Sequence, residues 1–268
     1  MIEVLYVATS SYAEYRHEFF STFKYFAPGR EKHITILSDG MEDCDGIILE
    51  DGTRVSVVKM FDLLYPCINL HKSYFIEQLN FNADYIFYFD ADTKFKNVPG
   101  YDWDAMFGAM DAGEVLISRH PVYSLKKGAY LLDWERDMWI SNFCSANMTE
   151  KDPRKQSYIA KDTYTYVISS FFAASNLTMH VLNGLIIKMN RADLTRNAYG
   201  AGYYIPPYMD ENYFNALVSD YESGIQNDGL KFSVRQYSQL YGKDDETVFY
   251  PESFIYQKNF PDYKTNRR

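Results

Sequence analysis

The stretch Tyr85–Phe95, YIFYFDADTKF, runs from five apolar or aromatic residues directly into two carboxylates that one alanine separates. A run of strand-forming residues of this length predicts a strand covered on both faces, as in the centre of an α/β sheet. Ligands of such sheets collect beyond the carboxyl ends of the strands, where Asp90 and Asp92 would lie. Because side chains at i and i+2 of an extended chain point to the same side, both carboxylates could reach one hard cation. The stretch therefore predicts a metal site, against the alternative of a strand that ends in an acidic turn.

Two classes of enzyme use a strand of this kind. Haloacid-dehalogenase-like phosphotransferases have Asp-x-Asp-x-Thr/Val on their first strand, whereas here Lys94 follows as the last position and the motif begins about a third of the way along the chain. Nucleotide-sugar glycosyltransferases of the GT-A class use Asp-x-Asp to bind Mn²⁺ or Mg²⁺ against the donor diphosphate. The second interpretation fits the position of the motif better.

Composition places the chain among globular proteins that do not bind nucleic acid. Its 268 residues are 47% hydrophobic and 18% aromatic, enough for a large core in one domain of mixed class or in two tightly merged ones. A formal net charge of -9 means that an anionic ligand needs local positive charge from a metal or from a few placed Lys and Arg.

The three cysteines are widely spaced and predict neither a disulfide framework nor a zinc site. With no basic leader and no apolar run of about 18 residues, we expect a soluble, cytoplasmic protein that does not span a membrane.

The order of the predicted elements is that of an α/β fold. The first strand, helix and second strand form one right-handed nucleotide-binding half in outline. The segment 124–162 has poor periodicity and predicts a long irregular connection, which is usually functional in a compact domain. No linker is long enough to divide the chain, so we expect a single domain over residues 1–268. Strands are predicted over 3–9, 33–37, 47–50, 54–59, 85–89, 114–118 and 166–174, helices over 13–26, 69–81, 102–110, 176–190 and 210–221, and short strands and a basic tail over the last forty residues.

Seven short segments occur in the order in which they occur in one enzyme family. They are LYVATSSY (5–12), YFAPG (25–29), FDAD (89–92), HPVY (120–123), EKDP with QSYI (150–159), FFAAS (171–175) and DENYFN (210–215). On these segments the chain resembles glycosyltransferase family 6, the retaining enzymes that include the histo-blood-group A and B transferases and α1,3-galactosyltransferase. The resemblance covers most of residues 3–217. The vertebrate members carry a membrane anchor and stem, and the chain is more similar to the soluble microbial members.

The resemblance implies a GT-A fold. A Rossmann-like nucleotide-binding half, about residues 1–118, would merge with an acceptor-binding and catalytic half, about residues 119–268, that ends in a tail. It implies transfer of galactose or N-acetylgalactosamine from a UDP-sugar to an oligosaccharide acceptor in α-1,3 linkage, with retention and with Mn²⁺ or Mg²⁺ as cofactor. A catalytically silent glycan- or nucleotide-binding protein on the same fold is the alternative. The presence of Asp90, Asp92 and Glu211 argues against it.

Donor binding falls, by the resemblance, on residues from both halves. Tyr12 would stack on uracil, or else only packs at the start of the first helix, and Ala8 and Thr9 would contact the nucleoside. Lys72 stands in place of a donor-contacting Arg, which keeps the charge but loses the bidentate fork. Asp90 and Asp92 would hold the divalent cation on the diphosphate.

Further donor contacts are implied in the second half. Ile168 and Ser170 take the positions that separate galactose from N-acetylgalactosamine donors, or are ordinary strand residues. Lys258 and Lys264 are spaced like two basic residues of a tail that closes over the diphosphate, or belong to a solvated basic end.

Glu211 is the residue to which the resemblance assigns the chemistry. In a retaining transfer one carboxylate lies on the sugar face opposite the leaving group, as a nucleophile or as the partner of an oxocarbenium-like centre. Asp210 would bind hydroxyls of the donor sugar. The alternative is that both acids match a helix dipole, which is worth about 0.3–1 kcal/mol.

Acceptor binding is implied for His120 and Tyr208, although a His before Pro is often structural. The chain departs from the family where Met209 replaces a His, where about twenty residues between Ser124 and Asn147 have no counterpart, and after Leu217, where the alignment is loose.

Overall fold

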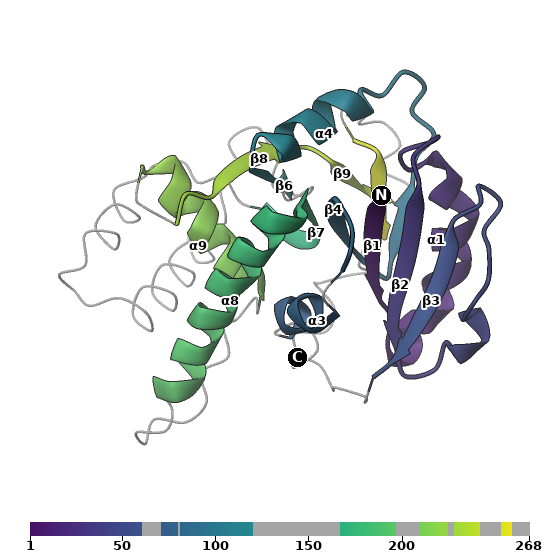
Figure 1. Ribbon diagram of the computed structural model, residues 1–268, viewed down its shortest axis with the longest axis horizontal. Helices are drawn as coiled ribbons and strands as arrows, with labels where there is room; N and C mark the ends of the chain where they lie inside the picture. Colours follow the sequence, from purple (N-terminus) through teal and green to yellow (C-terminus); the bar gives the residue numbers. More distant parts are fainter. Residues whose placement is uncertain are drawn as a thin grey trace, which may run out of the picture.

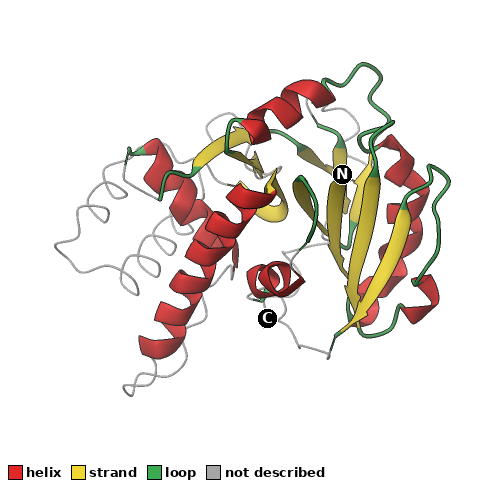
Figure 2. Cartoon of the chain, in the orientation of Figure 1, coloured by secondary structure: helices red, strands yellow, loops and turns green. Residues whose placement is uncertain are grey.

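The computed structural model describes residues 1–60, 71–79, 81–119, 167–196, 210–224, 228–241 and 253–258. Within them, helices cover both faces of a central sheet, as Figures 1 and 2 show. This mixed α/β architecture, compatible with a Rossmann-like fold, confirms the predicted class.

The central sheet has seven strands in the order β3-β2-β1-β4-β7-β6-β8. Only β7 is antiparallel to its neighbours, so the sheet is mainly parallel. The predicted central strand, β4, is the middle one. The strands are β1 (Ile2–Val7), β2 (Lys32–Ser38), β3 (Arg54–Lys59), β4 (Tyr85–Asp90), β6 (Glu114–Arg119), β7 (Val167–Ser175) and β8 (Lys231–Arg235).

Alternation along the strands builds two cores. Phe87 and Phe89 of β4 belong to the core under α1 (Arg16–Thr22) and α4 (Trp103–Asp111), while Ile86 and Tyr88 belong to the core under the helices of the other face. Each such side chain gains roughly 1.5–3 kcal/mol from full burial. The first core is mostly aromatic: Phe26 lies 5.3 Å from Phe89, centroid to centroid. The helices of the other face are α3 (Lys72–Leu79), α8 (Asn176–Arg196) and α9 (Asp210–Glu222).

Several helix boundaries follow from local signals in the sequence. Asp102 caps α4 by accepting a hydrogen bond from the Ala105 N–H at 2.9 Å, and the Ser175 hydroxyl accepts one from the Thr178 N–H at the start of α8. The predicted helix over 13–26 is α1 with a 3₁₀ turn on each side, η1 (Ser10–Tyr15) and η2 (Phe23–Tyr25). A third 3₁₀ turn, η3, spans Glu42–Cys44.

Two expectations about strands need correction. The strand predicted over 47–50 is a single bridge between Ile48 and Arg54, because the chain there folds back as a tight loop onto β3. A small second sheet, in the order β5-β10-β9, was not predicted in this form. It joins β5 (Thr93–Phe95) to β10 (Ile255–Lys258) and β9 (Ser238–Tyr241). The predicted irregular segment 124–162 lies outside the described residues.

Candidate functional site

The candidate site lies where the parallel strands end. Val7 of β1 pairs with Leu37 of β2 on one side and with Asp90 of β4 on the other. The segments that follow these three residues therefore leave the sheet at one edge. This confirms that the Asp-x-Asp motif follows the carboxyl end of the central strand, next to the turn that carries Ala8 and Thr9.

Asp90 is held by two donors. Its Oδ1 accepts hydrogen bonds from the Tyr88 hydroxyl at 2.7 Å and from the Lys72 Nζ at 3.1 Å. Lys72 is almost fully buried, and its ammonium also lies 4.7 Å from the centre of the Tyr88 ring. The Asp90 side chain itself is 35% exposed. A carboxylate fixed in this way keeps one face open to a ligand while Lys72 supplies local positive charge.

Asp92 is placed by a turn rather than by the strand. β4 ends at Asp90, and Ala91 and Asp92 form a turn before β5. The argument from alternating side chains therefore stops at Asp90. The Tyr6 hydroxyl donates a hydrogen bond to the Ala91 carbonyl at 3.0 Å. Burial, and then the nearby Asp92 carboxylate, raise the pKa of Tyr6 above its usual range.

The residues expected to contact the nucleoside follow β1. The Ala8 N–H donates to the Leu37 carbonyl at 3.0 Å, which ties the end of β1 to β2. The Thr9 carbonyl accepts from the Tyr12 N–H at 3.0 Å and so starts the turn η1. Tyr12 is 47% exposed, with its ring centre 6.0 Å from that of Tyr15. Its ring is accessible to a planar ligand, as the stacking prediction requires.

Strand β7 brings its amino-terminal end to the same edge because it runs antiparallel. Phe171 pairs with Phe89 in antiparallel register, so Ser170, the residue before Phe171, lies on the same side of this pair as Asp90. Ser170 is buried and Ile168 is half-buried. Both residues of the predicted sugar-selectivity pair thus lie on the strand next to the Asp-x-Asp motif.

The first turn of α9 is fastened to the start of β7 by Asn215. The Asn215 side-chain amide accepts a hydrogen bond from the Val167 N–H at 2.8 Å and donates to the Val167 carbonyl at 2.9 Å. It also donates to the Glu211 carbonyl at 2.9 Å. The half-buried Glu211 is thereby held beside Val167, which precedes the selectivity pair. Asp210 is the first residue of α9, and its side chain is outside what the structure describes.

The small sheet brings Lys258 back to the motif. Gln257 of β10 pairs with Thr93 of β5 in antiparallel register. Lys258 and Asp92 are the next residues beyond this pair, so their backbones are neighbours at one end of the small sheet. Only the backbone of Lys258 is described.

Three predicted site residues, His120, Tyr208 and Lys264, lie outside the described residues. Of the others, Ala8, Thr9, Lys72, Asp90, Asp92, Ser170, Glu211 and the Lys258 backbone come to the carboxyl edge of the sheet or are linked to it by the contacts above. Among the described side chains, no three His, Cys, Asp or Glu gather as a metal-binding group, so the two aspartates remain the predicted ligands.

Two residues with a part in this arrangement were not predicted. Tyr88 was assigned only to the strand, although its position two residues before Asp90 places its hydroxyl on the same side. Asn215 was quoted in the DENYFN segment without a role. Its spacing of four from Glu211 was the available signal, because an i, i+4 pair shares one helix face.

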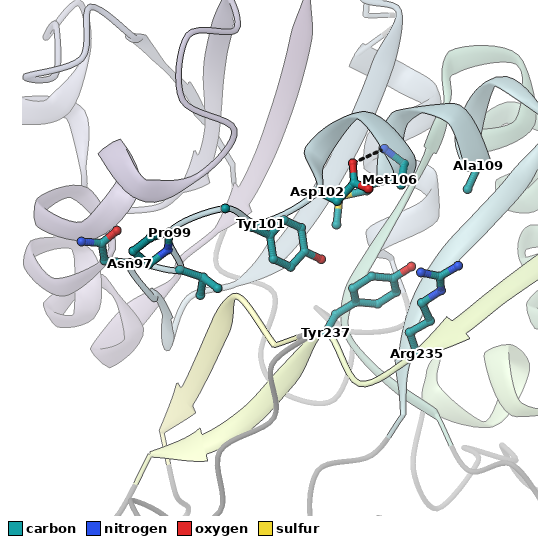
Figure 3. Close-up of a pocket in the computed structure, with 11 residues that line it drawn as sticks. Asn97, Pro99, Tyr101, Asp102, Met106, Ala109, Arg235 and Tyr237 are labelled. Carbon is teal, nitrogen blue, oxygen red and sulfur yellow. Dashed lines mark hydrogen bonds between the residues drawn. The ribbon is translucent and has the colours of Figure 1, made fainter.

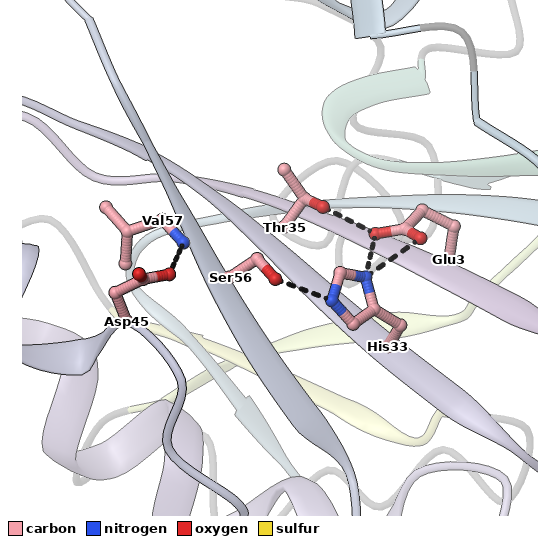
Figure 4. A network of polar contacts seen from close by, with 6 residues as sticks. All are labelled: Glu3, His33, Thr35, Asp45, Ser56 and Val57. Atoms are coloured by element: carbon pink, nitrogen blue, oxygen red, sulfur yellow. Dashed lines mark hydrogen bonds and ion pairs between the residues drawn. The ribbon is translucent and has the colours of Figure 1, made fainter.

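A separate polar cluster, away from this edge, joins the early residues of β1, β2 and β3 (Figure 4). The Glu3 carboxylate accepts hydrogen bonds from His33 Nδ1 at 2.9 Å and from the Thr35 hydroxyl at 2.7 Å, and His33 Nε2 lies 2.9 Å from the Ser56 hydroxyl. The bond to Glu3 raises the pKa of His33, against the opposing effects of burial and Arg54.

The contacts run from Ser56 through His33 to Glu3, as in enzymes in which a histidine base activates a serine nucleophile. The backbone N–H groups beside Ser56, however, already have hydrogen-bond partners. The N–H groups that flank Ser56, those of Val55 and Val57, donate to the Ile47 carbonyl and to the Asp45 carboxylate. Neither is therefore available to stabilise an oxyanion. We assign this cluster to the pairing of the three strands.

The chain matches no known protein family model and none of the curated proteins with which it was compared. Across the described parts of the chain, every helix is too short or too polar to cross a bilayer.

Proposed function

We propose that the protein is a retaining glycosyltransferase that moves galactose or N-acetylgalactosamine from a UDP-sugar to a glycan acceptor in α-1,3 linkage. The observation that carries the proposal is the convergence of distant segments on the Asp-x-Asp turn. Lys72 contacts Asp90 directly, the Lys258 backbone lies beside Asp92, and Asn215 anchors Glu211 next to β7. An acidic pair, nearby basic residues and a further carboxylate are the groups that diphosphate-sugar transfer requires.

The strand order supports a GT-A fold for the chain. A seven-stranded parallel sheet with one reversed strand next to its centre would combine a nucleotide-binding half with a strand whose amino-terminal end faces the donor. In this protein β7 is that strand and carries Ile168 and Ser170. The fold alone does not fix the reaction, so the proposal depends on the side chains.

The described residues fit a divalent cation. Asp90 Oδ1 is used by Tyr88 and Lys72, whereas its Oδ2 makes no hydrogen bond to any described residue. Oδ2 of Asp90 and the carboxylate of Asp92 are hard oxygen donors of the kind that Mn²⁺ and Mg²⁺ take. When bound there, the cation would neutralise the charge that develops on the diphosphate as UDP leaves.

The chain's own residues would supply the rest of the chemistry. The bond between the anomeric carbon and the diphosphate oxygen breaks, and UDP leaves with the electron pair. The acceptor hydroxyl forms the new bond on the same face of the sugar and gives its proton to an oxygen of the departing diphosphate. Glu211 would stabilise the positive charge at the anomeric carbon, or bond to it transiently, on the opposite face. Lys72 would keep Asp90 fixed and share in balancing the diphosphate charge.

The test is a pair of neighbouring substitutions, with release of UDP from UDP-galactose and UDP-N-acetylgalactosamine as the readout. Glu211→Gln should lower turnover by about 10²–10⁴-fold with little change in donor affinity, since one preorganised charge is lost while the shape is kept. Asp210→Asn should weaken donor binding as well as turnover. Thermal unfolding should show both variants folded.

The contrasting result is equally clear. If the two acids only match the helix dipole, each substitution costs at most about 1 kcal/mol of stability and leaves UDP release unchanged. Wild-type protein that binds UDP-sugar and Mn²⁺ without ever releasing UDP would instead favour the silent binding protein. Turnover of Glu211→Gln within about threefold of wild type would place the catalytic carboxylate elsewhere.

A further inference from the structure

A cavity of about 520 Å³ opens beside α4, outside the candidate transfer site (Figure 3). Its walls come from the loop 97–102, from one side of α4, from Arg235 at the end of β8, and from Tyr237 in the connection between β8 and β9. None of the residues of the Asp-x-Asp turn lines it. Its volume falls within the roughly 300–1,000 Å³ of small-molecule sites.

The aromatic walls of the cavity are fixed by packing. Tyr101 is half-buried, and its ring centre lies 4.6 Å from that of Trp103 and 5.3 Å from that of Phe254. Tyr237 is almost fully buried and packs 5.3 Å from Phe171, centroid to centroid. Met106 is also buried and adds an apolar surface. A ligand would therefore meet preformed aromatic and apolar walls and would not have to order them.

Two exposed charged groups complete the lining. Asp102 is held in place because one carboxylate oxygen accepts from the Ala105 N–H, while its other oxygen makes no hydrogen bond to any described residue. Arg235 forms no ion pair within the described part of the chain, and its guanidinium offers several donors. The two charges cancel, so the cavity has acceptors and donors for hydroxyl groups without a net charge.

We propose that this cavity is a binding subsite for a neutral sugar unit of a glycan. A pyranose ring has an apolar face that suits the Tyr101 ring and a rim of hydroxyls that can donate to Asp102 and accept from Arg235. A phosphate or nucleotide fits less well, because Asp102 offsets the charge of Arg235 and leaves the lining without the net positive charge that an anion needs. This subsite goes beyond the proposed transfer: it needs no UDP, no cation and no turnover.

Direct binding tests the subsite on the full chain, with three neutral disaccharides, lactose, maltose and cellobiose, as probes. Saturation-transfer NMR should show transfer to at least one of them, and titration calorimetry should give its affinity. Arg235→Gln and Asp102→Asn should each weaken that affinity by about tenfold, since each removes a hydrogen bond to a charged group. Asn remains a good helix cap, so Asp102→Asn should stay folded.

A filling variant and a matched control sharpen the experiment. Ala105 lines the cavity from an exposed helix position, so Ala105→Trp should block sugar binding while leaving the protein folded. Arg54→Gln removes an exposed arginine from the edge strand β3 and should leave sugar affinity unchanged. UDP affinity, measured in parallel, should be the same in all four variants.

Three results would overturn the proposal. They are the absence of saturation transfer to all three disaccharides, sugar binding that survives Ala105→Trp, and binding of inorganic phosphate in place of sugar. If the wild type fails to bind UDP or to release it from a UDP-sugar, the proposed transfer reaction is contradicted but the sugar subsite is not. The two failures can therefore be told apart.

Discussion

Truncating Asn215 should uncouple α9 from the sheet. The side chain is 3% exposed and makes three hydrogen bonds of 2.8–2.9 Å, two of them to the N–H and carbonyl of Val167. In Asn215→Ala these two buried backbone groups lose their side-chain partner, at a cost of about 1–3 kcal/mol for each group left unsatisfied. We expect a loss of about 2–6 kcal/mol of unfolding free energy, which corresponds to a fall of roughly 4–24 °C in Tm for a chain of this size.

Chemical denaturation and calorimetry measure this loss, and a second buried amide provides the control. Asn183 of α8 is fully buried, and neither the oxygen nor the nitrogen of its amide has a hydrogen-bond partner among the described residues. Asn183→Leu keeps the volume and removes an unpaired polar group, so it should change stability by no more than about 1 kcal/mol or increase it. Equal stability loss in the two variants would refute the anchoring role of Asn215. Under the proposed function, Asn215→Ala should also lower kcat more than it weakens UDP affinity, because the first turn of α9 carries Glu211.

Other changes have separate readouts. EDTA should abolish UDP release and Mn²⁺ should restore it; full activity in EDTA would contradict the assignment of Asp90 and Asp92. Lys72→Met should cost about 1–3 kcal/mol of stability, measured by denaturation, and should tighten Mn²⁺ binding because a competing cation is lost; weaker Mn²⁺ binding would show that Lys72 assists the cation. Glu3 raises the pKa of His33, so the ion pair between them stabilises the fold fully below about pH 6.5, and this stabilisation is lost as pH rises through the higher pKa of the folded state. The difference in unfolding free energy between wild type and His33→Gln should shrink over that pH range. A difference that does not change with pH would contradict this role of the pair.

Pattern and local chemistry were enough to predict most of the sheet. The alternation and burial of Tyr85–Phe89, the capping residue Asp102 and the β-rich segment around Phe171 each carry their own signal, and the corresponding elements form where expected. These signals act over a few residues, so they survive without knowledge of the rest of the chain.

Features that depend on distant partners could not be derived in this way. β5 is three residues long and exists because β10, at residues 255–258, pairs with it. The alternation expected to align Asp92 with Asp90 fails because the chain turns at Ala91 to reach that partner. The contact between Lys72 and Asp90 likewise depends on how α3 packs against the sheet. Composition could indicate only that positive charge was needed near an anionic ligand.

The small sheet β5-β10-β9 forms late during synthesis, because its strands lie far apart in the sequence. Because residues 93–95 find their strand partner only at residues 255–258, the Asp-x-Asp turn cannot gain the neighbouring Lys258 backbone until residue 258 has left the ribosome. Strands β1, β2 and β3 of the central sheet, by contrast, are complete by residue 59. A nascent or prematurely ended chain would hold the acidic pair without the strand that closes on it. The neighbourhood of the Asp-x-Asp turn therefore forms only after residues 255–258 have been synthesised.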